Sequence, residues 1–185
     1  MKWIFFSHRL PPKPSKLRVH VWRQLKKIGA VSYQSVWVIP YMKNLISDLE
    51  SLASHIETYG GGSLLIEGKP INKAEEERIL KAFLEASTEE YQEIANKCDD
   101  FLKEIASEIA RKNFIFAEVE ENEEDFDKLK KWFKKVEDRH LLKNPLRKLG
   151  AQKLKMCEKV LDDFSVQVFN HAQRKKKQEQ SRARS

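Results

Sequence analysis

Residues 15–40 constrain the fold more than any other stretch, because they combine an amphipathic helix, a glycine and two short apolar strands. Four apolar residues recur in this helix at spacings of four, four and three, namely Leu17, Val21, Leu25 and Ile28. This spacing places them on one helical face. Ser15 is a favourable N-cap residue, and Gly29 is expected to end the helix because glycine adopts the left-handed backbone without penalty.

The opposite side of this helix is basic. Lys16, His20, Arg23 and Lys27 fall together there, whereas Arg18 projects at the edge of the apolar stripe. A guanidinium at that edge needs a partner, because burying it unpaired is costly. Two interpretations of Arg18 stay open. It forms an internal salt bridge or extends its stem to water, or it contacts an anion, a DNA phosphate or a dimer partner.

The order of elements in residues 1–72 predicts an α+β domain. Strands and helices are expected at residues 2–8, 15–28, 30–39 (two strands around a turn), 43–59 and 63–67. The β-α-β-β-α-β order is the signature of a ferredoxin-like sandwich. We therefore expect a four-stranded antiparallel sheet with two helices, ferredoxin-like in its arrangement.

Residues 73–173 predict a helical extension packed on this domain. Asn72 is the expected N-cap, and three later apolar stripes of four-three spacing are typical of an antiparallel helix bundle. We expect the first helix of this extension, which begins after Asn72, to restart at Ser87–Thr88. An apolar interruption is expected at 114–119. Pro145 and Gly150 are expected to bracket a further break. Residues 174–185 are polar and basic, which predicts a disordered basic tail.

The net charge of +7 is unevenly distributed along the chain. Residues 1–72 hold ten Lys/Arg against four Asp/Glu, and residues 73–173 hold nineteen against twenty-three. A run without any acid contains seven Lys/Arg, namely Arg9, Lys13, Lys16, Arg18, Arg23, Lys26 and Lys27. A single-sign cluster on a folded element indicates nucleic-acid binding better than total charge does. These seven are our candidate DNA- or anion-binding residues.

Other classes of site find no support in the sequence. The five histidines do not stand at metal-ligand spacing, and the serines form no nucleophile elbow. Cys98 and Cys157 are far apart in helical patterns, which favours small buried hydrophobes in a reducing cytoplasm over a disulfide. No apolar run approaches the length of a membrane span. We therefore expect a cytoplasmic protein without enzymatic activity, metal, cofactor or membrane contact.

The run from Trp3 to Pro40 resembles a known family. The residues that carry the resemblance are Trp3, Leu10, Pro11, Ser15, Arg18, Val19, Trp22, Arg23, Leu25, Lys26, Gly29 and Ala30. They resemble the N-terminal domain of the bacterial chromate-resistance regulator ChrB. The resemblance continues through Tyr91, the segment 116–136 and the last helix, and it covers nearly all of residues 2–172. The chain is also similar to the ferredoxin-like part of PaaX-type regulators.

The resemblance implies repression of a chromate-resistance operon and DNA binding. Full-length members carry a further C-terminal domain tied to the chromate response, whereas this chain ends in a basic tail, and we recognise no PaaX-type winged helix in it. Our first interpretation is a DNA-binding transcriptional regulator. The alternative is a dimerising protein-interaction module without chromate sensing. A small-oxyanion sensor that uses Arg18 and Arg23 is a third hypothesis, and a homodimer remains open in each case.

Overall fold

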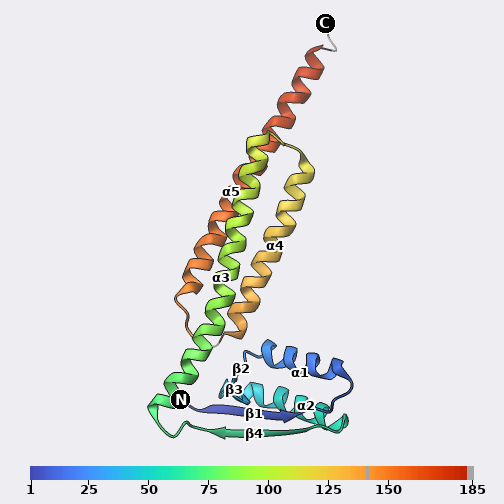
Figure 1. The fold of residues 1–185 in the computed structure, drawn as a ribbon. Coiled ribbons are helices and arrows are strands. Elements are labelled where there is room, and N and C mark those ends of the chain that lie inside the picture. Colours follow the sequence, from blue (N-terminus) through green and yellow to red (C-terminus); the bar gives the residue numbers. More distant parts are fainter. Residues whose placement is uncertain (141, 183–185) are drawn as a thin grey trace. The chain divides into compact units, whose positions relative to one another are not determined.

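The computed structural model describes residues 1–140 and 142–182. Its elements, in chain order, are β1 (Trp3–Arg9), α1 (Ser15–Lys27), β2 (Val31–Tyr33), β3 (Val36–Pro40), α2 (Lys43–Thr58), β4 (Gly62–Gly68), α3 (Lys73–Arg111), α4 (Phe116–Arg139) and α5 (Leu146–Arg182) (Figure 1). The chain divides into two compact units. The first comprises Met1–Ser87 with Asp138–Lys143, and the second comprises Thr88–Glu137 with Asn144–Ser185.

The first unit contains a four-stranded sheet in the order β2-β3-β1-β4. Every strand pair is antiparallel, and β1 pairs along its whole length with β4, from Trp3 opposite Gly68 to Arg9 opposite Gly62. Helices α1 and α2 lie on one face of this sheet (Figure 1). The expected mixture of helices with an antiparallel sheet is confirmed, and the expected element ends in this unit differ from the observed ones by no more than one or two residues.

Alternation along β1 supplies both faces of the sheet with apolar side chains, as the period-two geometry of a strand requires. Ile4 and Phe6 are buried in a cluster with the apolar faces of α1 and α2. Trp3, which points to the other face, is buried with Ile79 and Phe83 of α3. The sheet of the first unit is therefore covered by α1 and α2 on one side and, in part, by the start of α3 on the other.

Helix α1 begins at the expected residue but without the expected cap. Its N-cap residue is Pro14, in an extended conformation, and no side chain caps the helix, so Ser15 is the first helical residue rather than the cap. Its end follows the expectation: Gly29 has φ +78° and its N–H donates to the carbonyl oxygen of Lys26 at 3.1 Å. A Cβ at Gly29 would lie 2.0 Å from the carbonyl oxygen of Arg139. Glycine is therefore required at this position by backbone conformation and by space.

Helix α3 runs without a break from Lys73 to Arg111, so the expected restart at Ser87–Thr88 is wrong. The Ser87 hydroxyl donates to the carbonyl oxygen of Leu84 at 3.0 Å, a local bond that a helix accommodates. The cap at Asn72 is confirmed, because its Oδ1 accepts a hydrogen bond from the backbone N–H of Glu75 at 2.9 Å.

Helices α3, α4 and α5 lie side by side in the second unit (Figure 1) and share one buried apolar cluster. The interruption expected at 114–119 is shorter and earlier, because α4 already begins at Phe116. Gly150 does not break the last helix. It is buried inside α5, where an added Cβ would lie 3.0 Å from the Phe133 ring. In place of the expected disordered tail, residues 174–182 continue α5 as an exposed helix, and 183–185 lie outside the described residues.

Replacement of Gly29 by alanine should destabilise the first unit far more than the same change at Gly60. Both glycines have positive φ, +78° and +75°, so alanine costs about 1–2 kcal/mol at each. Only Gly29 faces a backbone carbonyl, whereas nothing lies within 4 Å of a Cβ at Gly60. We expect Gly29→Ala to cost on the order of 3 kcal/mol or more in urea unfolding. Equal losses for the two variants would show that the close approach to Arg139 does not matter.

Candidate nucleic-acid interface

Burial of one side of α1 determines where its cations lie. Leu17, Val21 and Leu25 are at most 3% exposed against the sheet and α2. The candidate residues on or before this helix are consequently at the surface: Arg9, Lys13, Lys16, Arg18, Arg23 and Lys27 are exposed, and Lys26 is partly exposed. The structure therefore leaves all seven available to a partner, but it does not gather them at one point.

The α1 cations form two flanks. At 100° per residue, the first flank consists of Lys16, Arg23 and Lys27 and lies toward α2. The second flank consists of Arg18 and Lys26 and lies on the other side of the helix. Arg18 and Arg23 are therefore on different flanks. This separation gives the small-oxyanion hypothesis no convergent pair of guanidinium groups.

Arg18 has a partner, but not one of the expected kind. It is exposed, and its Nη2 donates to the backbone carbonyl oxygen of Pro12 at 3.2 Å. The bond ties the first turn of α1 to the proline-containing segment that precedes it. This exposure fits the interpretation in which the stem of Arg18 extends past the apolar stripe to water.

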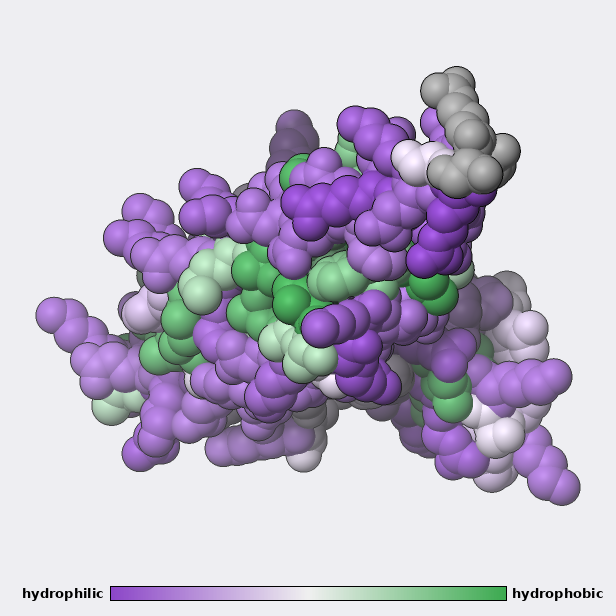
Figure 2. Space-filling view, turned by 90° about the horizontal axis from the view of Figure 1, so that it is seen from above, coloured by the Kyte–Doolittle hydropathy of each residue, from purple (hydrophilic) through white to green (hydrophobic). Residues whose placement is uncertain are grey.

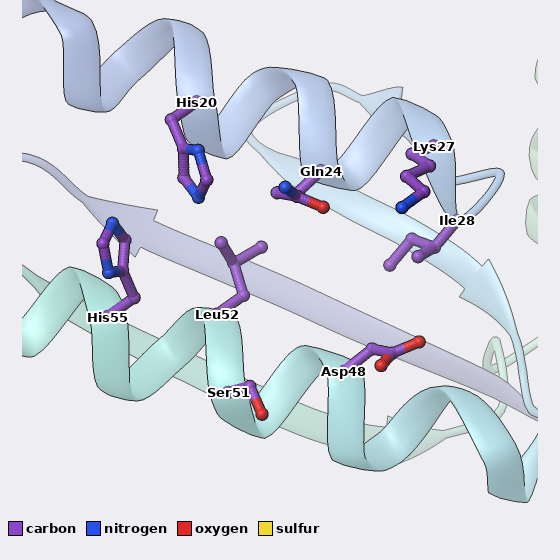
Figure 3. Close-up of a pocket in the computed structure, with 8 residues that line it drawn as sticks. All are labelled: His20, Gln24, Lys27, Ile28, Asp48, Ser51, Leu52 and His55. Atoms are coloured by element: carbon purple, nitrogen blue, oxygen red, sulfur yellow. The ribbon is translucent and has the colours of Figure 1, made fainter.

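A groove of about 430 Å³ separates α1 from α2 along the first flank (Figure 3). The residues that line it are His20, Gln24, Lys27 and Ile28 from α1, and Asp48, Ser51, Leu52 and His55 from α2. The His20 and His55 rings face each other across it, with centroids 4.9 Å apart, and Tyr59 meets His55 edge-on at 5.2 Å. Sequence reasoning placed His20 on the basic face but missed the groove, because its second wall is formed by α2.

The electrostatic environment of these cations differs from that of the cations on the later helices. Across residues 1–140 and 142–182, none of the seven candidate side chains forms an ion pair with a carboxylate. In the second unit, by contrast, lysines and arginines pair with nearby acids, as in Lys128–Asp125 at 2.7 Å and Lys103–Asp100 at 3.4 Å. Cations without carboxylate partners leave a positive field that attracts an anionic partner.

The second flank carries exposed apolar side chains that sequence reasoning did not assign to a site. Trp22 is 52% exposed and Val19 is 46% exposed. Trp22 stands four residues after Arg18 and four before Lys26, so one aromatic ring lies between two cations on one flank. A tryptophan inside a basic run is the signal that could have identified it, since aromatic and basic side chains together recur in nucleic-acid and protein interfaces.

Metal-binding and membrane-spanning features were also sought. Within the part of the chain that the structure describes, no group of three or more His, Cys, Asp or Glu side chains could hold a metal ion. No helix there is long and apolar enough to cross a membrane.

The chain matches a known protein family. The model of the family described as Protein ChrB, N-terminal, matches residues 18–175. The matched segment begins within α1 and extends through α5 past Val168, the last buried residue of that helix. No curated protein and no solved structure matches the chain.

Replacement of Arg18 by alanine should change stability only slightly. The side chain is exposed and contributes one hydrogen bond, to Pro12, whose carbonyl water can reach once the guanidinium is removed. We expect a loss of about 0.5–1 kcal/mol in urea unfolding. Lys13→Ala is the matched control, because Lys13 is also exposed and its side chain forms no hydrogen bond within the described part of the chain. A loss above about 2 kcal/mol for Arg18→Ala would mean that the link to Pro12 organises the whole start of α1.

Proposed function

The chain belongs to the ChrB N-terminal family, and from this premise we propose that it is a non-enzymatic, DNA-binding transcriptional regulator linked to chromate resistance. The observation that supports DNA binding most directly is the run of seven cations on and before α1, none of which pairs with a carboxylate among the described residues. Such a run releases condensed counterions from DNA when it contacts phosphates, which is the main source of affinity in sequence-independent binding. We place this activity in the cytoplasm, as expected for a DNA-binding protein of a bacterium.

We also propose that the first unit is ferredoxin-like. Its strand order, β2-β3-β1-β4, and its β-α-β-β-α-β connectivity with α1 and α2 on one face support this assignment. In such an arrangement the helical face carries the basic surface, and the sheet supplies the rigid base that holds α1 in place.

The spacing of the first flank suits a row of phosphates. Lys16 and Lys27, with Arg23 between them, are eleven positions apart, which is about 16 Å along the helix axis at 1.5 Å per residue. Contacts to phosphates position a protein on the duplex but do not read its sequence. Base recognition would then fall to side chains of the second flank, among them Val19 and Trp22.

The end of α5 is a second basic surface. Residues 174–182 are helical and fully exposed, and Arg174, Lys175, Lys176 and Lys177 follow one another there. Four adjacent cations on an exposed helix would add phosphate contacts without adding sequence readout.

The alternative function is a dimerising or partner-binding module, which the exposed apolar side chains favour. Trp22, Val19, Leu64 and Ile66 are each 46–57% exposed in the first unit, and Phe169 is 62% exposed in the second. Hydrophobic residues also gather among hydrophilic ones on the face drawn in Figure 2. Tryptophan and arginine are the side chains most enriched at interface hot spots, so the Trp22 flank fits either a protein or DNA.

Replacing the three cations of the first flank by alanine should weaken DNA binding without unfolding the protein. We expect the triple variant Lys16→Ala, Arg23→Ala, Lys27→Ala to bind duplex DNA more weakly. The slope of log K against log salt should fall by about 2–3, since each phosphate contact contributes about 0.9. The melting temperature should change little because these side chains are exposed.

The matched control removes three cations that already have carboxylate partners, Lys81, Lys103 and Lys128. Both triple variants lose the same formal charge, so only a local effect separates them. If the two lose the same affinity, the binding reflects net charge alone. If neither loses any, and Trp22→Ala instead changes the oligomeric state in light scattering, the interaction module becomes the better interpretation.

Deleting residues 174–185 should leave the melting temperature nearly unchanged, because every described residue of this segment is exposed. DNA affinity should fall together with the salt slope, as cations that contact phosphates are removed. A clear drop in thermal stability would instead show that the basic end of α5 packs on the fold. Replacing Lys175, Lys176 and Lys177 by glutamine in the full chain separates loss of charge from loss of helix.

A further inference from the structure

The two cysteines of the chain, separated by 59 positions, lie next to each other in the second unit. Cys98 comes from α3 and Cys157 from α5, and both side chains are fully buried. The Cys157 thiol donates to the backbone carbonyl oxygen of Cys98 at 3.5 Å. Sequence reasoning correctly expected two buried thiols, but it treated them as separate because it could not place α5 against α3.

The surroundings of this pair are apolar on one side and charged on the other. Both cysteines belong to the buried cluster of the bundle. Lys153 lies one turn before Cys157 and forms an ion pair with Asp99, the residue after Cys98. An ammonium group therefore lies close to the two thiols.

The two thiols are not equivalent. The interaction of the Cys157 thiol with the Cys98 sulfur lowers the pKa of Cys98, and the charge of Lys153 acts in the same direction against the effect of burial. The same interaction between the two side chains, together with burial, raises the pKa of Cys157. Cys98 is therefore the thiol that ionises first, and Cys157 holds its proton.

We propose that Cys98 and Cys157 are an oxidation site at which a hydroperoxide forms an intrachain disulfide between α3 and α5. The proposal rests on the position of the Cys157 sulfur, 3.5 Å from the Cys98 carbonyl oxygen, in a buried cluster that both cysteines share. It is independent of DNA binding.

The chemistry requires one two-electron oxidant. The Cys98 thiolate attacks one oxygen of the peroxide and breaks the O–O bond, which yields a Cys98 sulfenic acid and, after protonation, an alcohol or water. The Cys157 sulfur, once deprotonated, then attacks the sulfenic sulfur and displaces its hydroxyl as water, so the S–S bond forms. In sum, two thiols and one hydroperoxide give a disulfide, an alcohol and water. The two sulfurs supply the electrons, and their two protons end in the products.

Full burial sets the kinetics of this site. A peroxide reaches the pair only when the bundle opens locally, so oxidation should be slower than that of an exposed thiol. Once formed, the disulfide closes a loop that contains all of α4. A cross-link of this kind restricts the unfolded chain and stabilises the folded one.

The test uses the full-length reduced protein treated with hydrogen peroxide. We expect the intact mass to fall by two hydrogens, non-reducing proteolysis to yield a peptide that joins Cys98 to Cys157, and the melting temperature to rise until dithiothreitol reverses it. Cys98→Ser and Cys157→Ser should each fail to form the cross-linked peptide, and their far-UV spectra should show that they remain helical.

The proposal would be overturned if both free thiols are recovered, after prolonged exposure to peroxide, when the protein is unfolded. It would also be overturned by sulfinic acids without the joined peptide, or by a disulfide found only between chains. Diamide, a thiol oxidant that proceeds without a sulfenic acid, provides a second measurement on the wild type. If diamide also fails to link the pair, the contact between the thiols is too poorly oriented for a disulfide.

Discussion

The surface chemistry of this protein depends on the burial of one face of α1. Leu17, Val21 and Leu25 pack against the sheet and α2, and each such burial contributes about 1.5–3 kcal/mol. Turning the helix to bring its cations inward would lose that energy and leave unpaired charges in an apolar core. The positive surface is therefore a consequence of core packing. The residues that build the core also determine which side chains a partner can meet.

The features that local sequence carries were the ones that could be predicted. Apolar spacing placed α1, α2 and the three later helices, and the positive φ of Gly29 followed from its place at a helix end. Local sequence signals gave wrong predictions of helix ends where a long helix continues through them. Ser87 and Thr88 look like a helix start, yet α3 passes through them because the apolar stripe continues on both sides. Gly150 likewise remains helical because the bundle needs a small residue beside Phe133.

The features that depend on two distant segments could not be predicted in the same way. The clash that excludes a side chain at Gly29 comes from Arg139, and the groove beside α1 has α2 as its second wall. The contact between Cys98 and Cys157 depends on how α3 and α5 pack. Arg18 shows the limit for single side chains: helical geometry gave its direction, but its partner is the carbonyl of Pro12, in an irregular segment without periodicity.

Charge pairing, rather than total charge, separates the two kinds of surface on this chain. Before Arg174 the second unit holds many lysines and arginines, but ion pairs such as Lys103–Asp100 and Lys128–Asp125 bring opposite charges together along the same helix, so the surface field there is largely local. Helix α1 itself contains no acidic residue, so its cations have no carboxylate partner on their own helix. A binding partner with regularly spaced negative charges would pair with these cations over the whole length of the helix. An acidic protein would need matching carboxylates at each position, whereas a nucleic-acid backbone carries a phosphate at every nucleotide. This regular repeat is the physical reason for proposing DNA as the partner of this surface.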